Sequence, residues 1–301
     1  MTPVQDLGEY HGNHLWIKRE DLLPFSFGGN KARKAELFFR EIDRGQYDCV
    51  VSYGSSSSNH CRIVANACCR RHLDCYIVSP LEASEATFNS RMMALFGAGI
   101  ITVPVECVHD TIENKLAELK KAGRKPFFIP GGGHGNTGTE AYVQCYDEIR
   151  QYEAENQVHF DAIFHASGTG TTQAGLVCGR LLHGDQTQII GISIARKNPR
   201  GRNVVVESVR EYCAGRIRED AVQEAVCFLD EYTEGYGKDD QEVLQTIEHV
   251  LRTYGIPMDM TYTGKAFTGM TKYIENIRGK NLLFIHTGGT PLFFDCLRKS
   301  I

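Results

Sequence analysis

Short apolar segments rich in β-forming residues alternate along this chain with segments of helical periodicity. The apolar segments are CVVSYG (49–54), CYIVS (75–79), GIITVPV (99–105), PFFIP (126–130), DAIFHA (161–166), QIIGISIA (188–195) and NLLFIHT (281–287). Helical patterns begin at Asn30 and Ser58 and run through 85–96, 110–122, 137–155, 170–183, 240–254 and 264–278. This alternation predicts an α/β fold of parallel strands covered by helices, and the uninterrupted apolar strands indicate burial on both faces.

Composition excludes several classes of protein. The 301 residues suffice for two domains at roughly 150 residues each, and 42% apolar with 23% charged residues exclude a disordered chain, a fibrous repeat or a small disulfide scaffold. The net charge of −4 predicts no binding to nucleic acid or to an anionic membrane. No segment approaches the roughly 18 apolar residues of a membrane span. The first residues lack the basic start and apolar core of a signal peptide, so we expect a cytoplasmic protein.

The eleven cysteines are predicted to be reduced core residues. None has C-x-x-C spacing, and many fall inside apolar segments such as DCVVSYG and AVCFLD. A free cysteine behaves as a small apolar residue, so we predict neither disulfides nor a metal site. The polar, glycine-bearing stretches NPRGRN (198–203) and YTEGYGKDDQ (232–241) are predicted to be surface loops.

Four predicted strands run into glycine-rich turns, of which Gly168, Thr169, Gly170, Thr171 and Thr172 form the sharpest. Small residues there let backbone N–H groups converge on an anion, and threonine hydroxyls add donors. The turn lacks the Gly-Lys-Ser/Thr ending of a P-loop, and Gln173 occupies the third-glycine position of a dinucleotide fingerprint. The pattern fits a phosphate site and a tight strand–helix turn about equally.

The other three turns are SSSSNH (55–60), GGGHGNTG (131–138) and HTGG (286–289). Ser58 and Asn59 are typical residues of a helix start. The free amides of that start, together with Ser58 and His60, could bind a substrate carboxylate, although plain capping explains the pattern as well.

The segment FGGNKARKAELFFREIDR places a lysine on the buried face of a predicted helix. Lys31 lies four residues before Ala35, so it shares the apolar stripe of Ala35, Phe38, Phe39 and Ile42. Burial lowers the pKa of an ammonium group and prepares it to form a Schiff base, whereas a lysine in a first helical turn can also reach solvent. The charged residues expected elsewhere on this helix are Arg33, Lys34, Glu36, Arg40 and Glu41.

A buried lysine, a phosphate-binding turn and a carboxylate-binding helix start together match the requirements of pyridoxal 5′-phosphate. The motifs KREDLLPFSFGGNKARKAE, SSNHCR, the glycine/threonine turn, GYG, YTGKA and HTGGTP occur in an order that resembles the D-cysteine desulfhydrase / 1-aminocyclopropane-1-carboxylate (ACC) deaminase family. The resemblance extends from residue 18 to about residue 294. It implies pyridoxal 5′-phosphate as cofactor and the fold-type II, tryptophan synthase β-like architecture of two open, twisted, mostly parallel sheets flanked by helices.

The resemblance also implies roles for individual residues. Lys31 matches the Schiff-base lysine, and Asn30 matches the asparagine that binds the phenolic oxygen of the cofactor. Thr287 would meet the pyridine nitrogen, and a hydroxyl partner there favours β-elimination over transamination. The remaining matches are Ser58, Asn59 and His60 for substrate carboxylate, Gly168, Thr169, Gly170, Thr171 and Thr172 for phosphate, and Tyr236 and Tyr262 as active-site tyrosines.

The implied reaction is α,β-elimination on a small amino acid, giving a keto acid, ammonia and a leaving group such as sulfide. Lys31, Ser58 or a tyrosine would remove the Cα proton. His60 and Thr263 favour the desulfhydrase branch, because the deaminase pattern has glutamine and glutamate there. The alternatives are an ACC deaminase, a β-replacement synthase and a non-enzymatic regulatory protein that binds the cofactor or phosphate.

The resemblance further implies two domains and a homodimer. Residues 1–43 and 147–301 would form a large cofactor-binding domain, and residues 44–146 would form a small domain that closes over the substrate.

Overall fold

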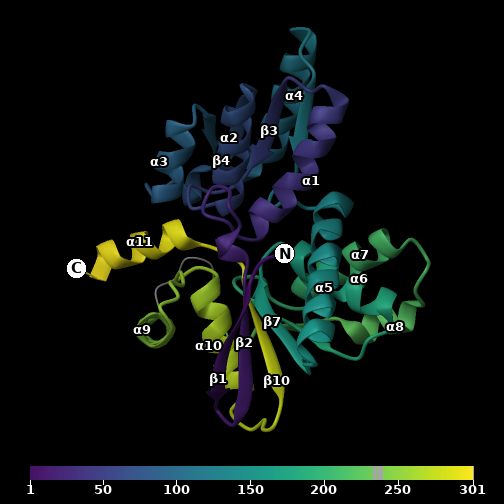
Figure 1. Cartoon of the computed structure of the whole chain (residues 1–301). Coiled ribbons are helices and arrows are strands. Elements are labelled where there is room, and N and C mark those ends of the chain that lie inside the picture. The colour runs from purple at the N-terminus through teal and green to yellow at the C-terminus, as the bar shows by residue number, and fades with distance from the viewer. Residues whose placement is uncertain (233–234, 236–239, 301) are drawn as a thin grey trace.

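The computed structural model describes residues 1–232, 235 and 240–300 and divides the strands between two sheets (Figure 1). The smaller sheet has the strand order β5-β4-β3-β6, and all its neighbouring strands are parallel. Its strands are β3 (Cys49–Tyr53), β4 (Asp74–Pro80), β5 (Gly99–Val103) and β6 (Pro126–Ile129). These strands lie at the predicted positions. The central strands β3 and β4 are mostly buried, as continuous apolar runs predict. The edge strand β5 is largely exposed and β6 is half-buried, so the prediction of burial on both faces is wrong for these two strands.

The larger sheet has the strand order β1-β2-β10-β7-β8-β9. Only the pair β1–β2 is antiparallel, so the predicted α/β fold with two mostly parallel sheets is confirmed. Its strands are β1 (Val4–Tyr10), β2 (Asn13–Arg19), β7 (Ala162–Ser167), β8 (Gln188–Ser193), β9 (Cys227–Leu229) and β10 (Asn281–His286).

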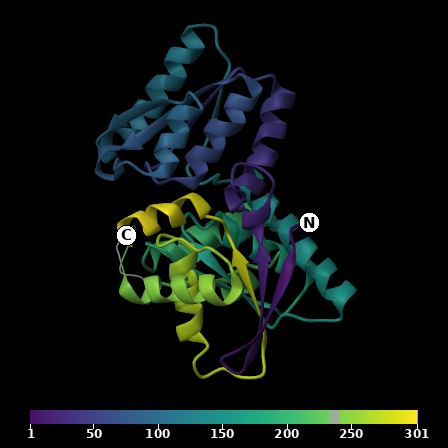
Figure 2. The same cartoon turned by 60° about the vertical axis from the view of Figure 1, so that its left-hand side comes forward.

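Helices cover both sheets (Figures 1 and 2). Those grouped with the smaller sheet are α1 (Asn30–Gly45), α2 (Asn59–Arg71), α3 (Phe88–Leu95) and α4 (Val108–Lys121). Those grouped with the larger sheet are α5 (Asn136–Asn156), α6 (Thr171–His183), α7 (Arg200–Cys213), α8 (Glu219–Ala225), α9 (Gln241–Tyr254) and α10 (Thr263–Tyr273). The last helix, α11 (Thr290–Ser300), leaves the larger sheet and contacts α3, so it joins the two halves.

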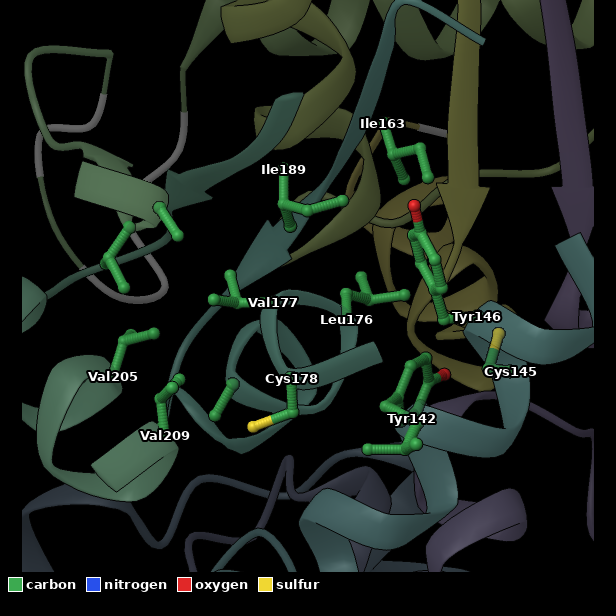
Figure 3. Packing of buried hydrophobic residues seen from close by; sticks show 14 of the residues in the cluster. Tyr142, Cys145, Tyr146, Ile163, Leu176, Val177, Cys178, Ile189, Val205 and Val209 are labelled. Atoms are coloured by element: carbon green, nitrogen blue, oxygen red, sulfur yellow. The ribbon is translucent and has the colours of Figure 1, made fainter. Parts of the chain in front are cut away.

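Each sheet has its own apolar core. The predicted face of α1, formed by Ala35, Phe38, Phe39 and Ile42, is buried against α2 and the smaller sheet. The core on one face of the larger sheet is formed by α5, α6 and α7 against β7 and β8 (Figure 3). A Cβ atom added at Gly175 of α6 would lie 2.4 Å from Tyr142 Cβ of α5. This close helix contact fixes the start of α6, where the glycine/threonine turn ends.

The segment 198–203 is a turn only at Asn198 and Pro199, so the loop prediction is wrong from Arg200 onward. Helix α7 begins at Arg200 directly after Pro199, and proline is well suited to a helix start. A Cβ atom at Gly201 would lie 2.3 Å from the ring of Phe228, so this glycine allows close packing rather than a turn. In the second predicted loop, α9 begins at Gln241, and residues 233–234 and 236–239 lie outside the described residues.

The cysteines are free thiols and mostly buried, which confirms their use as small core residues. Cys69 and Cys107 are exposed and Cys227 is partly exposed. Within the described ranges, no helix combines the length and apolar character needed to cross a bilayer.

The two cores bear on the predicted domain boundaries. Helix α1 packs into the core of the smaller sheet, and α5 packs into that of the larger sheet. The division at residues 43 and 146 stays a prediction.

Candidate active site

The start of α1 meets the carboxyl ends of strands from both sheets. The backbone N–H of Asn30 donates to Thr287 O at 3.0 Å, just beyond β10. Its side-chain Nδ2 donates to Thr172 Oγ1 at 3.0 Å, in the first turn of α6, which follows β7. Lys31 Nζ donates to Gly132 O at 3.1 Å, just beyond β6. The structure therefore brings together Asn30, Lys31, Thr172 and Thr287, which the sequence placed up to 257 residues apart.

Two glycine pairs allow this meeting. Gly29 has φ 94°, and a Cβ atom on it would lie 2.7 Å from Thr287 O. Gly288 has φ 99°, and a Cβ atom on it would lie 2.7 Å from Gly29 Cα. Glycine alone tolerates both the left-handed backbone and this separation. The glycines of G-G-N-K and H-T-G-G thus pack backbone against backbone.

Two lysines of α1 point to the same carbonyl group. Burial lowers the pKa of Lys31 to about 8, and Lys34 Nζ lies 3.5 Å from Gly132 O. The prediction that Lys34 lies off the buried face is wrong, since only 1% of its surface is exposed, whereas the side chain of Lys31 is half-buried. The 131–133 turn and the ring of Tyr142, 5.9 Å from Lys34 Nζ, cover a second side of α1. Burial and the neighbouring charge of Lys31 hold the pKa of Lys34 well below its usual value.

Cationic and donor groups surround the glycine/threonine turn. Gly170 has φ 92° and precedes α6, whose first N–H groups have no intrahelical acceptors. Arg196 Nη1 donates to Thr169 O at 3.1 Å, and His134 Nδ1 lies 2.9 Å from Thr171 Oγ1. Free amides, two buried hydroxyls and the Arg196 guanidinium make a suitable site for a phosphate group. Lys34, His134 and Arg196 were not predicted for this site, since each reaches it from a different segment of the chain.

Gln173 has a structural reason to replace glycine after this turn. Its Oε1 accepts from Ser167 Oγ at 2.9 Å, and its Nε2 donates to Cys227 O at 2.5 Å. A Cβ atom at Gly191 would lie 2.1 Å from Gln173 Oε1. The side chain thus fills the space over β8 and ties the start of α6 to β7 and β9.

The S-N-H segment forms the start of α2. Ser58 Oγ accepts from the Cys61 N–H at 3.2 Å, so the capping prediction is confirmed. The N–H groups of Asn59 and His60 lie in the first turn, where a helix provides them no acceptor. Their role in carboxylate binding stays a prediction.

The imidazole of His60 faces the interior of the smaller sheet. Its Nε2 lies 2.9 Å from Ser52 Oγ, and Ser52 donates its hydroxyl to Ile129 O at 2.8 Å. The Nε2–H must therefore donate to Ser52. Burial, with the charges of Lys31 and Lys34, lowers the pKa of His60 to about 3. The ring is neutral near pH 7, so the backbone N–H is the group that His60 offers to a carboxylate.

Tyr262 precedes α10 in a turn held by a buried carboxylate. Asp259 Oδ1 accepts from the Tyr262 N–H at 2.7 Å, and its Oδ2 accepts from Thr263 Oγ1 at 2.9 Å. A Cβ atom at Gly289 would lie 2.1 Å from Asp259 Oδ2, so this turn adjoins the loop after Thr287. Tyr236 lies outside the described residues, and Lys265 donates to Gly235 O beside it.

Comparison with known proteins assigns the family. Residues 1–288 match the family model described as pyridoxal-phosphate dependent enzyme. The chain belongs to this family and is an enzyme that uses pyridoxal 5′-phosphate.

The chain is similar to two proteins named D-cysteine desulfhydrase. It is 32% identical to that of Yersinia enterocolitica and 30% identical to that of Serratia proteamaculans, in each case over 97% of this chain and 92% of the relative. It also superposes on the crystal structure of an ACC deaminase homologue with a TM-score of 0.87 and 29% identity, covering 100% of this chain and 94% of the other.

The described residues fit this cofactor. Lys31 provides an amine whose pKa of about 8 lies far below that of a free lysine. The glycine/threonine turn provides donors for the phosphate, with Arg196 as a neighbouring cation, and Thr287 provides a buried hydroxyl.

Proposed function

We propose that this enzyme is a D-cysteine desulfhydrase-like lyase, which eliminates sulfide from D-cysteine and leaves pyruvate and ammonia. The observation that carries the proposal is the pairing of Lys31, an amine of lowered pKa, with the anion-binding turn that Asn30 bonds directly. The two desulfhydrases that match 97% of the chain support the substrate.

The bound cofactor would supply one thing that side chains lack, an electron sink for the negative charge that develops at the substrate Cα. The residues of the chain hold and orient the groups around it. The first turn of α2 would bind the substrate carboxylate through the Asn59 and His60 N–H groups and the Asn59 amide. Lys31, Ser58, Tyr262 or Tyr236 would take the Cα proton. The Cβ–S bond then breaks, sulfide leaves with the bonding pair, and water completes the release of pyruvate and ammonia.

Residue 263 separates the two branches of the family resemblance. In the deaminase pattern this residue is a glutamate, whose carboxylate is charged. Here it is Thr263, an uncharged residue whose hydroxyl donates to Asp259. With Thr287 as the proposed partner of the pyridine nitrogen, this arrangement favours β-elimination over ring-opening deamination.

The setting of the enzyme is also a proposal. The cysteines are free thiols, which suits a reducing compartment such as the cytoplasm. We propose a homodimer in which the part of each chain around the smaller sheet, residues 44–146, closes over a small amino-acid substrate.

Product analysis tests the reaction. Purified enzyme given D-cysteine is expected to release sulfide, pyruvate and ammonia in equal amounts. Parallel reactions contain L-cysteine, ACC, or O-acetylserine with sulfide. Keto acid from ACC and none from D-cysteine would replace the proposal by the deaminase. Formation of a new amino acid would indicate β-replacement, and no turnover of any substrate would favour a regulatory protein.

The pKa of Lys31 predicts how fast the cofactor-free enzyme captures pyridoxal 5′-phosphate. The ammonium form is not a nucleophile, so the capture rate should rise as the pH passes through about 8 and level off above it. Stopped-flow absorbance between pH 6 and pH 10 would measure this, with N-acetyl-lysine, whose pKa is about 10.4, as the reference amine. A rate that still rises at pH 10 would show that no amine of lowered pKa takes part.

A further inference from the structure

Asn89 is a buried amide outside the site described above. It lies in the first turn of α3 with no exposed surface, and it faces the residues that precede and begin α2. Its Nδ2 donates to Ser57 O at 2.8 Å and to Asn59 Oδ1 at 2.9 Å. Both hydrogens of this amide group are therefore used on one short segment.

The Ser57 carbonyl fixes which way the Asn89 amide points. A backbone carbonyl can only accept, so the atom of Asn89 that faces it must be the NH2 group. The atom of Asn59 that receives the second bond must then be an acceptor, its Oδ1. Asn89 Oδ1 has no partner among the described residues, so Asn89 forms its side-chain hydrogen bonds through its NH2 group.

Arg62 fixes Asn59 in the same direction. Its guanidinium is buried, has only donors, and lies with Nη2 3.5 Å from Asn59 Oδ1. The same group holds the loop before α1 through a bond from Nη1 to Ser26 Oγ at 2.8 Å. Two donors thus converge on Asn59 Oδ1, and the NH2 group of Asn59 must occupy the other side of its amide.

We propose that Asn89 is a positioning residue that turns the NH2 group of Asn59 toward the carboxylate of the substrate. The inference rests on the proposed role of the α2 start in carboxylate binding. Helix α3 is well placed for this task, because Thr87 Oγ1 also donates to Ser56 O at 2.8 Å. Asp295 of α11 accepts from the Phe88 N–H at 3.0 Å, so the larger half of the molecule holds the same helix.

The test compares two ligands that differ only in the carboxylate. Alanine has no β-leaving group, and ethylamine is alanine without its carboxylate. Spectral titration of the enzyme loaded with cofactor gives a Kd for each, for both alanine enantiomers, and the ratio of the two constants measures carboxylate recognition. Wild-type enzyme should bind one enantiomer more tightly than ethylamine.

Asn89→Ala is expected to reduce this ratio by about 10- to 100-fold, the range for losing a hydrogen bond to a charged group. The Kd for ethylamine should change less than about 2-fold. A change of that size is within the uncertainty with which the effect of a substitution can be attributed to one lost contact. Ser90→Ala is the matched control, because Ser90 lies next to Asn89 in α3 but its side chain bonds, among the described residues, to Thr87 alone. It should leave the ratio unchanged.

Asn59→Asp supplies a second test that keeps a hydrogen-bond acceptor at position 59. A carboxylate at 59 would still accept from Asn89 and Arg62, but it would repel the ligand carboxylate, so the preference for alanine should disappear. Equal weakening of alanine and ethylamine by Asn89→Ala, or an unchanged ratio in both variants, would overturn the inference. If wild-type enzyme bound alanine no more tightly than ethylamine, both the role of Asn89 and the proposed carboxylate site would be overturned. A failure of the proposed elimination reaction alone would be seen separately, as absence of turnover in the D-cysteine assay.

Discussion

Replacing Lys31 by alanine is expected to abolish turnover and the visible absorption of lysine-bound cofactor. The loss of turnover should be at least about 10³-fold, because the side chain proposed to hold the cofactor and move a proton is removed. Absorption spectra and sulfide release from D-cysteine measure the two effects. The fold should persist, since Lys31 donates one bond to Gly132 O and forms no ion pair among the described residues.

Lys34→Met is the matched control for this variant. It removes the amine of the more deeply buried lysine, which faces the same carbonyl, 3.5 Å away. We expect weaker binding of the cofactor, because a hydrogen-bond donor beside Gly132 is lost, and Gly132 lies against Thr169 of the phosphate turn. The visible absorption should nevertheless return at high cofactor concentration. A Lys31→Ala enzyme that keeps its colour and turnover, beside a colourless Lys34→Met enzyme, would exchange the roles of the two lysines.

Replacing Glu20 by alanine is expected to destabilise the protein by about 3–5 kcal/mol, the usual effect of leaving buried charges without their partner. Glu20 is fully buried and accepts from Arg33 Nε at 2.6 Å and from Thr2 Oγ1 at 2.6 Å. Lys18 and Glu148 complete the cluster, with Lys18 Nζ 2.7 Å from Glu148 Oε2. The hydrogen bonds to Glu20 and Glu148 outweigh burial and raise the pKa of Arg33.

Urea unfolding followed by circular dichroism measures this effect. Glu36→Ala is the control, since Glu36 lies on α1 in an ion pair with Arg40 whose side chains are 62% and 57% exposed. Removal of an exposed pair should change the stability by less than about 1 kcal/mol. Equal effects of the two substitutions would show that the buried cluster does not hold α1 to β2 and α5.

The sequence predicted the parallel strands and the starts of α1 and α2 because local patterns determine them. A strand buried on both faces is apolar throughout, and Ser58 caps the helix after it with its own side chain. The glycine/threonine turn was found for the same reason. The hairpin of β1 and β2 was not predicted. Its turn residues His11 and Gly12 both have positive φ, as a tight hairpin turn requires.

Burial of charged residues could not be predicted from local patterns. Lys34 lies three residues after Lys31, which places the two side chains on neighbouring positions of the helix surface. Its burial, however, depends on Tyr142 and the 131–133 turn, about a hundred residues later in the chain. Two partners of Glu20, Arg33 and Tyr142, come from the distant helices α1 and α5. The role proposed for Asn89 likewise depends on a contact with another helix.

The most direct test is to locate the covalent link between enzyme and cofactor. Borohydride reduction of the coloured enzyme makes the link permanent, and mass spectrometry of a protease digest then identifies the modified lysine. We predict one pyridoxyl phosphate group per chain, on Lys31. Modification of Lys34 or Lys265 instead, or an unmodified chain after saturation with cofactor, would contradict the proposed site.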